Sequence, residues 1–268
     1  MPSPSISDLD LDFTRPWFPG LAEHLVGPVL AARGLTPATY RTKRWIDGEA
    51  VDAGPPSRFE DPPSSLIKPY AEMGLAFAAP PSSKAHALLG DAWGFLDRVP
   101  DAEQAISTLV CSIHVLEPPG PGYDTSHSDP DLPCSIFLSL PIGEPHAALR
   151  AAESILHEAM HLQLTLIEAQ VPVVRASGAT LYSPWQQCHR PVSGLVHGLY
   201  VFAAIDAYLA ELLTQDGVLD ETAAFARKRR REIGEEISEA REVVGHNDLT
   251  RFGLAFVDGL LAEMNARA

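Results

Sequence analysis

A stretch of 25 residues with no internal helix breaker constrains the fold more than any other part of the sequence. It reads PHAALRAAESILHEAMHLQLTLIEA and covers residues 145–169, with its one proline at the first position. Proline is tolerated in the first turn of a helix, and the next proline, Pro172, comes just after the stretch. The sequence therefore predicts one long helix, whose apolar side must be covered by other elements.

Three further helices are predicted toward the C-terminus. The run SGLVHGLYVFAAIDAYLAELLTQ (193–215) is apolar nearly all round, which indicates burial. The runs LDETAAFARKRRREIGEEISEAREVV (219–244) and NDLTRFGLAFVDGLLAEMNARA (247–268) contain candidate capping residues, Asp220 and Asn247, near their starts. Together these segments predict a helical bundle.

The beginning of the chain has a different composition. Residues 1–65 are rich in proline and in turn residues. One helix is expected there, around LAEHLVGPVLAAR (21–33), and Gly27 and Pro28 are expected to interrupt it.

Residues 66–100 have a helical pattern, which is strongest in SSKAHALLGDAWGFLDRV (82–99). Ser83 is the candidate capping residue of that helix. We therefore expect an N-terminal region, residues 1–100, packed on a main domain, residues 101–268.

Two short apolar runs predict β-strands. STLVCSIHVLE (107–117) is rich in β-branched residues, and CSIFLSL (134–140) is closed by a turn sequence. The polar segment GYDTSHSDPDLP (122–133) between them is expected to be a loop, and the two strands could pair. The predicted fold class is α+β: a mainly helical bundle with a small β-sheet packed beside the helix of residues 145–169.

The charge balance excludes some classes of function. Lys and Arg total 20 against 35 Asp and Glu, a net charge of −15, whereas a nucleic-acid-binding surface needs a basic footprint. Three scattered cysteines do not form a disulfide framework. No signal peptide and no membrane-spanning run is recognised. The sequence thus predicts a reduced, cytoplasmic protein without a nucleic-acid or membrane partner.

The long predicted helix carries the motif H-E-x-x-H as His157, Glu158 and His161. On a helix, positions i and i+4 lie about 40° apart around the axis and about 6 Å along it, so both imidazoles can reach one metal ion. Apolar neighbours such as Leu156 and Met160 are expected to bury this part of the helix. Residues 101–268 are therefore the predicted metal-binding domain.

A catalytic metal site needs a third protein ligand and an open position. His197 is the candidate, at the start of the next long helix and after a connecting loop of residues 171–192. Gly194 and Gly198 on either side of it would let the two helices approach closely. Competing residues are His189, Asp206 and Glu211. Of these, Asp206 faces the opposite side of its helix from His197, and Glu211 lies about 21 Å further along.

Three segments together resemble a known family. LPCSIFLSLP, ILHEAMHLQL and LYSPWQQCHRPVSGLVHGLYVF are similar to the HExxH-motif family of peptide-modification proteins, over residues 105–215. Members of that family are described as iron(II)/2-oxoglutarate-dependent peptide β-hydroxylases. The resemblance implies that His157, His161 and His197 bind iron and that a ribosomally made precursor peptide is the partner and substrate.

A 2-oxoglutarate oxygenase has further requirements. Three protein ligands leave positions for the keto acid and dioxygen, and a cation must hold the distal carboxylate. Arg190 is the candidate cation, with a surface or helix-capping arginine as the alternative. A site of three histidines departs from the common set of two histidines and one carboxylate and also suits zinc, so the metal identity stays open.

Glu158 separates the competing functions. In a zinc-dependent metallopeptidase it would be the catalytic base that takes a proton from metal-bound water. In an oxygenase it would orient a ligand, a substrate or a water molecule. A third interpretation is a non-catalytic protein that a metal stabilises.

Other features have both a structural and a functional interpretation. The edge of the strand CSIFLSL could hold an extended peptide, or the strand could simply be part of the core. The basic run ARKRRRE (226–232) is explained by pairing with acidic residues one turn away, with binding of an acidic peptide as the alternative. Tyr182, Trp185 and Tyr200 could line a pocket or belong to the core.

Overall fold

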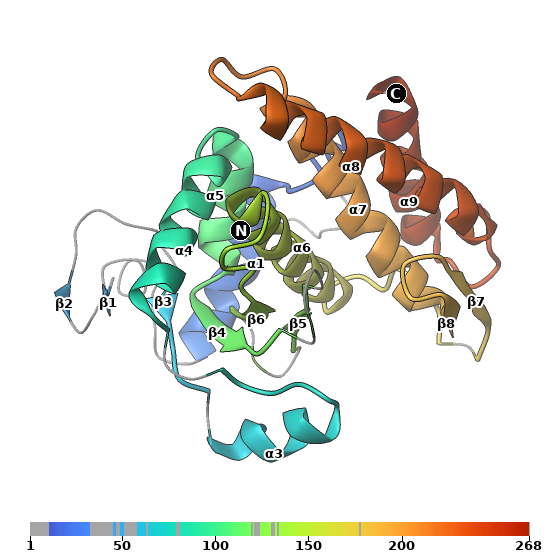
Figure 1. The fold of residues 1–268 in the computed structure, drawn as a ribbon. Coiled ribbons are helices and arrows are strands. Elements are labelled where there is room, and N and C mark those ends of the chain that lie inside the picture. Colours follow the sequence, from blue (N-terminus) through green and yellow to red (C-terminus); the bar gives the residue numbers. More distant parts are fainter. Residues whose placement is uncertain are drawn as a thin grey trace. The chain divides into compact units, whose positions relative to one another are not determined.

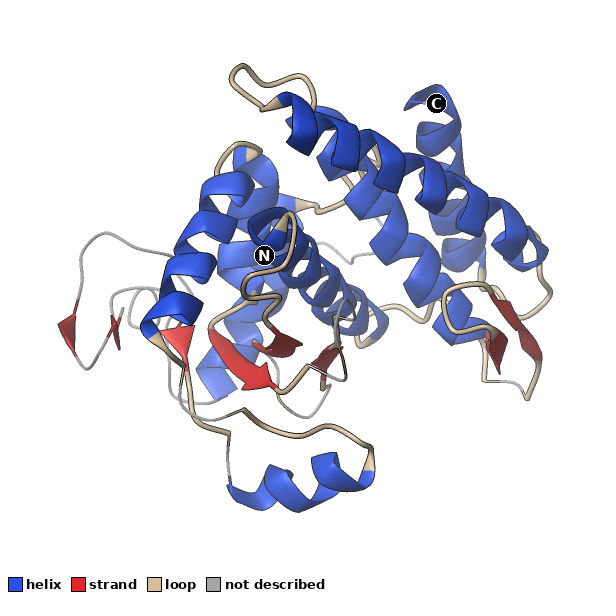
Figure 2. Cartoon of the chain, in the orientation of Figure 1, coloured by secondary structure: helices blue, strands red, loops and turns tan. Residues whose placement is uncertain are grey.

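The computed structural model of the chain is shown in Figure 1. It describes residues 11–32, 45–46, 49–50, 58–62, 64–78, 81–118, 120, 124–129, 132, 134–176 and 178–267. The chain divides into two compact units: Met1–Phe18 together with Gln163–Ala268, and Pro19–Leu162. The second unit runs across residue 100, where the sequence suggested a boundary. Helices make up most of the regular structure and the strands are short (Figure 2), which confirms the α+β class.

The unit of residues 19–162 contains a four-stranded sheet in the order β3-β4-β6-β5. Strands β3 (Arg58–Phe59), β4 (Ser112–Leu116) and β6 (Ser135–Ser139) are parallel, and β5 (Ser126–Ser128) is antiparallel to β6. Every residue of β6 is buried, as expected for the interior strand of a parallel sheet. The predicted pairing of the two apolar runs is therefore confirmed. A separate two-stranded sheet pairs β1 (Trp45–Ile46) antiparallel with β2 (Glu49–Ala50).

Two strand predictions were wrong in part. Residues 107–109, predicted as strand, end the helix α5 (Pro100–Leu109), because Ile106 and Leu109 continue the buried side of that helix. The predicted loop of residues 122–133 contains β5, which pairs with β6 although its own residues are polar. Backbone pairing to a buried neighbour compensates for the missing apolar signal.

Helix α1 (Pro19–Ala32) continues through Pro28, so the predicted interruption was wrong. Pro28 is exposed, while Leu21, Ala22, Leu25 and Val26 are buried, so tertiary packing outweighs the lost backbone hydrogen bond. The other helices of this part of the unit are α3 (Ser64–Glu72) and α4 (Ser83–Leu96). Helix α4 is capped by Ser82, not by the predicted Ser83, because the Ser82 hydroxyl accepts from the Ala85 amide at 3.3 Å.

The other unit contains α7 (Val192–Leu212), α8 (Asp220–Glu239), a short 3-10 turn η2 (Ala240–Val243) and α9 (Arg251–Arg267). Helix α7 packs against both α8 and α9 and is buried nearly all round, as its sequence predicts. Among the described residues it is the one helix that is long and apolar enough to cross a membrane, although 72% of the window that meets this test is buried.

The predicted N-cap residues of the last two helices, Asp220 and Asn247, were both wrong. Leu219 occupies the N-cap position of α8, and Asp220 lies in the first turn, where its charge complements the helix dipole. Helix α9 starts at Arg251, four residues after Asn247, and the Thr250 hydroxyl accepts from the Gly253 amide at 3.0 Å. Leu219 makes no side-chain capping bond, so of these two helices only α9 has a side-chain cap of this kind.

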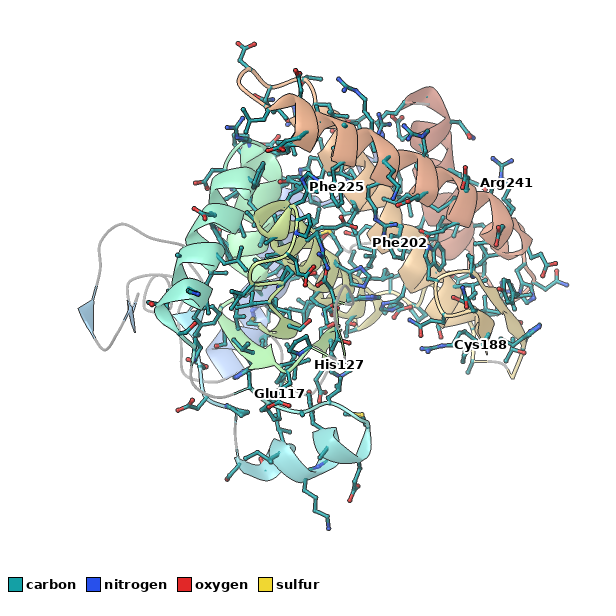
Figure 3. All side chains as sticks on the ribbon, in the orientation of Figure 1. Glu117, His127, Cys188, Phe202, Phe225 and Arg241 are labelled. Carbon is teal, nitrogen blue, oxygen red and sulfur yellow. The ribbon has the colours of Figure 1, made fainter. Side chains whose placement is uncertain are left out.

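The residues predicted as a connecting loop, 171–192, contain an antiparallel hairpin. Its strands are β7 (Thr180–Ser183) and β8 (Cys188–Pro191), and β8 is exposed along its whole length. Exposed Cys188 lies on this hairpin (Figure 3). Because β8 has no buried face, the alternation that marks a half-buried strand is missing from its sequence.

A buried polar network ties the segment before α1 to this unit. The Gln163 side-chain amide donates to the Trp17 carbonyl at 2.8 Å. The Tyr200 hydroxyl donates to the Pro16 carbonyl at 2.7 Å and also contacts Oε1 of Gln163. Phe18 and Tyr200 stack with nearly parallel rings, so polar and apolar contacts hold the same segment.

A close backbone approach fixes the start of α9. A Cβ added at Gly253 would lie 2.0 Å from the Val173 carbonyl oxygen. That oxygen also accepts from the Thr250 amide at 3.0 Å. Only glycine leaves room for the chain at residue 173.

Candidate metal centre

Helix α6 (Ala147–Glu168) carries His157 and His161 one turn apart. Their ring centroids are 4.8 Å apart, with an interplanar angle of 66°. Both side chains are half-buried, while the flanking Leu156 and Met160 are fully buried. The helix therefore presents two imidazoles side by side above a water-excluding core.

Glu158, between the two histidines, is buried with 2% of its surface exposed. Burial raises the pKa of its carboxyl group to about 7, opposed by hydrogen bonds from the side chains of Ser126 and Ser128. Its Oε1 lies 3.8 Å from Nε2 of His157. A carboxyl group with a pKa near neutrality can hold or release a proton at physiological pH.

The two serines come from strand β5, which the sequence did not predict. Ser126 and Ser128 are two residues apart, so they share one side of the strand and meet α6 together. His127 between them contacts the ring of Tyr70 instead, with 5.5 Å between ring centroids. The pattern S-H-S is visible in the sequence, but only the position of β5 beside α6 shows that its two serines bond to Glu158.

Tyr70 and His127 form a second polar group in the same unit. The Tyr70 hydroxyl donates to Oδ2 of Asp129 at 3.0 Å. Burial, and then Asp129, raise the pKa of the Tyr70 hydroxyl, and burial lowers the pKa of His127. The Tyr70 hydroxyl and the His127 ring are therefore neutral near pH 7.

His197, the predicted third ligand, lies half-buried in α7. Its Nε2 is 3.0 Å from Oε2 of Glu168, the last residue of α6. Sequence reasoning missed Glu168, although it follows His161 by seven residues and so shares its side of the helix. A carboxylate on one ring nitrogen is typical of a metal-ligating histidine that is held in position, and equally of a structural ion pair.

The predicted ligands belong to different units. His157, Glu158 and His161 lie in the unit of residues 19–162, and His197 lies in the other. In the part of the chain that the structure describes, no three His, Cys, Asp or Glu side chains gather into a group that could hold a metal. His197 as the third ligand stays a prediction.

The structure also describes the competitors of His197. Asp206 is paired with Arg230, at 2.7 Å between Oδ1 and Nε, which gives it a structural role. His189 is exposed on β8, with its ring centroid 6.2 Å from that of Tyr182. Glu211 lies near the end of α7, 14 residues after His197.

Arg190, the predicted carboxylate clamp, is exposed on β8. Its side chain lies over Gly194, where an added Cβ would be 3.7 Å away. The guanidinium group therefore lies on the first turn of α7, the helix that carries His197 one turn later.

The expected role of the two glycines was wrong. Gly198 faces the ring of Trp185 from the hairpin, and an added Cβ would lie 2.5 Å from that ring. Trp185 in turn stacks on Phe202, with 5.1 Å between ring centroids. The small residues therefore admit the hairpin and its aromatic side chain, not a neighbouring helix. Of the three aromatic residues considered for a pocket, Tyr200 is a core residue and Tyr182 is exposed.

No protein-family model matches this chain, and no curated protein matches it.

Proposed function

We propose that the chain is an iron(II)/2-oxoglutarate-dependent oxygenase that hydroxylates a side-chain β-carbon of a ribosomally made precursor peptide. The motif H-E-x-x-H followed by R-P-x-x-G-x-x-H, from Arg190 to His197, supports this assignment. So does the pair of half-buried imidazoles on one side of α6.

The observation that carries the proposal is the environment of Glu158. Its carboxyl group is 2% exposed and accepts hydrogen bonds from two serine side chains. A base that activates metal-bound water needs that water within hydrogen-bonding reach, whereas a residue that orients its surroundings needs fixed partners. A buried carboxyl group that is held by two hydrogen bonds favours the orienting role.

The donor set fits a first-row divalent metal. Neutral imidazole is an intermediate ligand that suits iron, and we propose His157, His161 and His197 as the three ligands. With 2-oxoglutarate and dioxygen, iron(II) supplies the oxidising chemistry that replaces a C–H bond by C–OH. Arg190 would bind the distal carboxylate through its guanidinium fork.

The test uses anaerobically purified protein supplied with iron(II), 2-oxoglutarate and the precursor peptide, to which oxygen is then admitted. We expect succinate and a peptide product heavier by one oxygen atom, both dependent on oxygen. His157→Ala should abolish both, while His189→Ala, which changes an exposed histidine of the hairpin, should retain them. Absence of succinate and of modified peptide from every aerobic reaction would refute the proposal.

The second candidate is a zinc metallopeptidase, which the position of Glu158 beside His157 favours. A pKa near 7 and the 3.8 Å distance to His157 suit a catalytic base. Glu158→Gln distinguishes the two functions, because glutamine keeps an acceptor for the serines but cannot take a proton. Peptide cleavage that zinc supports and Glu158→Gln abolishes would establish the peptidase, whereas hydroxylation that survives in the variant would exclude that role.

A further inference from the structure

Residues of α7, α8, η2 and α9 line a cavity of about 520 Å³ within the unit that holds these helices. Four arginines line it, Arg227, Arg230, Arg231 and Arg241, together with one carboxylate, Asp206. We call this cavity the arginine pocket. Three of the arginines come from one side of α8 at spacings of three and four residues, so their side chains project from neighbouring turns.

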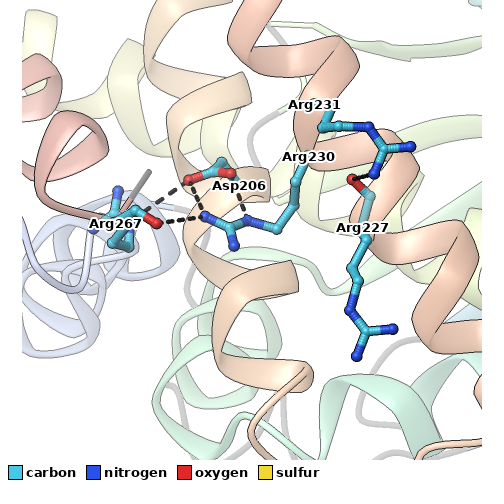
Figure 4. A network of polar contacts seen from close by, with 5 residues as sticks. All are labelled: Asp206, Arg227, Arg230, Arg231 and Arg267. Atoms are coloured by element: carbon cyan, nitrogen blue, oxygen red, sulfur yellow. Dashed lines mark hydrogen bonds and ion pairs between the residues drawn. The ribbon is translucent and has the colours of Figure 1, made fainter.

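The only carboxylate among the residues that line the pocket is already engaged. Oδ1 of Asp206 is 2.7 Å from Nε of Arg230, and Oδ2 is 3.6 Å from Nε of Arg267 (Figure 4). Figure 4 also shows the side chain of Arg227 directed away from Asp206. Four arginines against one aspartate leave the lining with a net charge of +3 (4 − 1), in a chain whose net charge is −15.

Pairing along the helix neutralises the neighbouring basic residues but not those of the pocket. Lys228 is 3.1 Å from Glu232, and Arg229 approaches Glu232 and Glu236 at 3.8 and 3.7 Å. Among the described residues, Arg227 and Arg241 have no acidic partner. The expected i,i+4 pairing therefore explains one side of the basic run and leaves the pocket side uncompensated.

Arg231 does not relieve this imbalance. Its Nη1 donates to the backbone carbonyl of Arg227 at 3.2 Å, not to a carboxylate, and the two arginines lie one turn apart on α8. Like charges at this spacing destabilise a helix. An anion bound between them would remove the repulsion.

The volume and lining of the pocket indicate a small ligand. Its volume falls within the usual range of small-molecule sites. Ile237, Leu261 and Met264 contribute apolar surface beside the arginines. Guanidinium groups bind carboxylate and phosphate through two parallel hydrogen bonds.

We propose that the arginine pocket binds a small organic anion that carries at least two phosphate or carboxylate groups and an apolar part. The proposal does not depend on iron or on oxygenase activity, because no predicted metal ligand lines the pocket.

Titration calorimetry on the metal-free full chain, at physiological salt, tests the proposal with pyrophosphate, ADP and citrate as probes. We expect at least one probe to bind with a Kd below about 1 mM. The double substitution Arg227→Gln and Arg241→Gln should weaken it at least tenfold, roughly the loss of one charged hydrogen bond. Binding of pyrophosphate or ADP identifies phosphate as the preferred group, and binding of citrate identifies carboxylate.

Lys228→Gln is the matched control, because it removes one positive charge from α8 outside the pocket and should leave binding unchanged. Ser238→Phe, which fills the pocket without changing its charge, should abolish binding, with circular dichroism confirming that each variant is folded. Failure of all three probes to bind would overturn the proposal. So would equal weakening by Lys228→Gln, or binding of a glutamate decapeptide alone.

Discussion

Replacing Gly198 by alanine tests whether Trp185 holds the β7–β8 hairpin on α7. The new Cβ would lie 2.5 Å from two ring carbons of Trp185, closer than packed atoms approach. Because this rigid ring is also stacked on Phe202, it must move away and lose that contact. Overpacking of this kind costs about 1–3 kcal/mol and a lost aromatic stack about 0.5–1.5 kcal/mol, while alanine in a helix gains about 1 kcal/mol over glycine. The net expectation is a loss of about 1–3 kcal/mol in the free energy of unfolding.

Gly194→Ala is the matched control on the same helix. An alanine Cβ there would make an ordinary contact with Arg190 at 3.7 Å, so the helix-propensity gain should appear undiminished, up to about 1 kcal/mol. Urea unfolding followed by circular dichroism measures both variants. The hairpin also carries Arg190, so Gly198→Ala should raise the KM for 2-oxoglutarate if the proposed clamp is correct. A Gly198→Ala protein as stable as the unmodified chain would refute the packing argument.

Three further predictions concern stability. Gly253→Ala should lower the free energy of unfolding by about 2 kcal/mol, because its Cβ meets a backbone carbonyl that cannot rotate away. Gly234→Ala, where nothing lies near the added Cβ, should be neutral or stabilising, and urea unfolding compares the two. Tyr200→Phe should cost about 1–3 kcal/mol in the same assay, since the two buried acceptors that share its hydroxyl proton lose their donor. An unchanged midpoint would contradict the network. Burial lowers the pKa of His114 below 6.5, so the unfolded chain binds a proton first and the free energy of unfolding should fall as the pH decreases through 6.5. His114→Leu should flatten that pH dependence. An equally steep decline in the variant would exclude His114 as its source.

Helical periodicity predicted the long elements well. Helices α6 and α7 lie within two or three residues of their expected bounds, because breaker-free apolar stretches leave few alternatives. The caps were less predictable, since Ser82 and Ser83 have the same chemistry, and only the hydrogen bond to Ala85 distinguishes them. Local sequence thus indicates that a helix exists better than where it begins.

The surroundings of the motif were harder to predict. Strand β5 has the sequence S-H-S and the hairpin strand β8 is exposed, so neither shows the apolar alternation of a half-buried strand. The contacts of Glu158 and of Trp185 could therefore not be predicted from the sequence. Glu168 could have been predicted from its spacing to His161 alone, because seven residues return a side chain to the same side of a helix.

The contacts of Pro16 and Trp17 have a consequence for the order of folding. The Tyr200–Pro16 hydrogen bond joins residues 184 positions apart, and the Gln163–Trp17 bond joins residues 146 apart. During synthesis, residues 16–18 leave the ribosome long before their partners exist. Contacts of such long range form slowly, so this unit can fold only after Tyr200 has emerged. Until then, the ring face of Phe18 that stacks on Tyr200 is exposed to solvent.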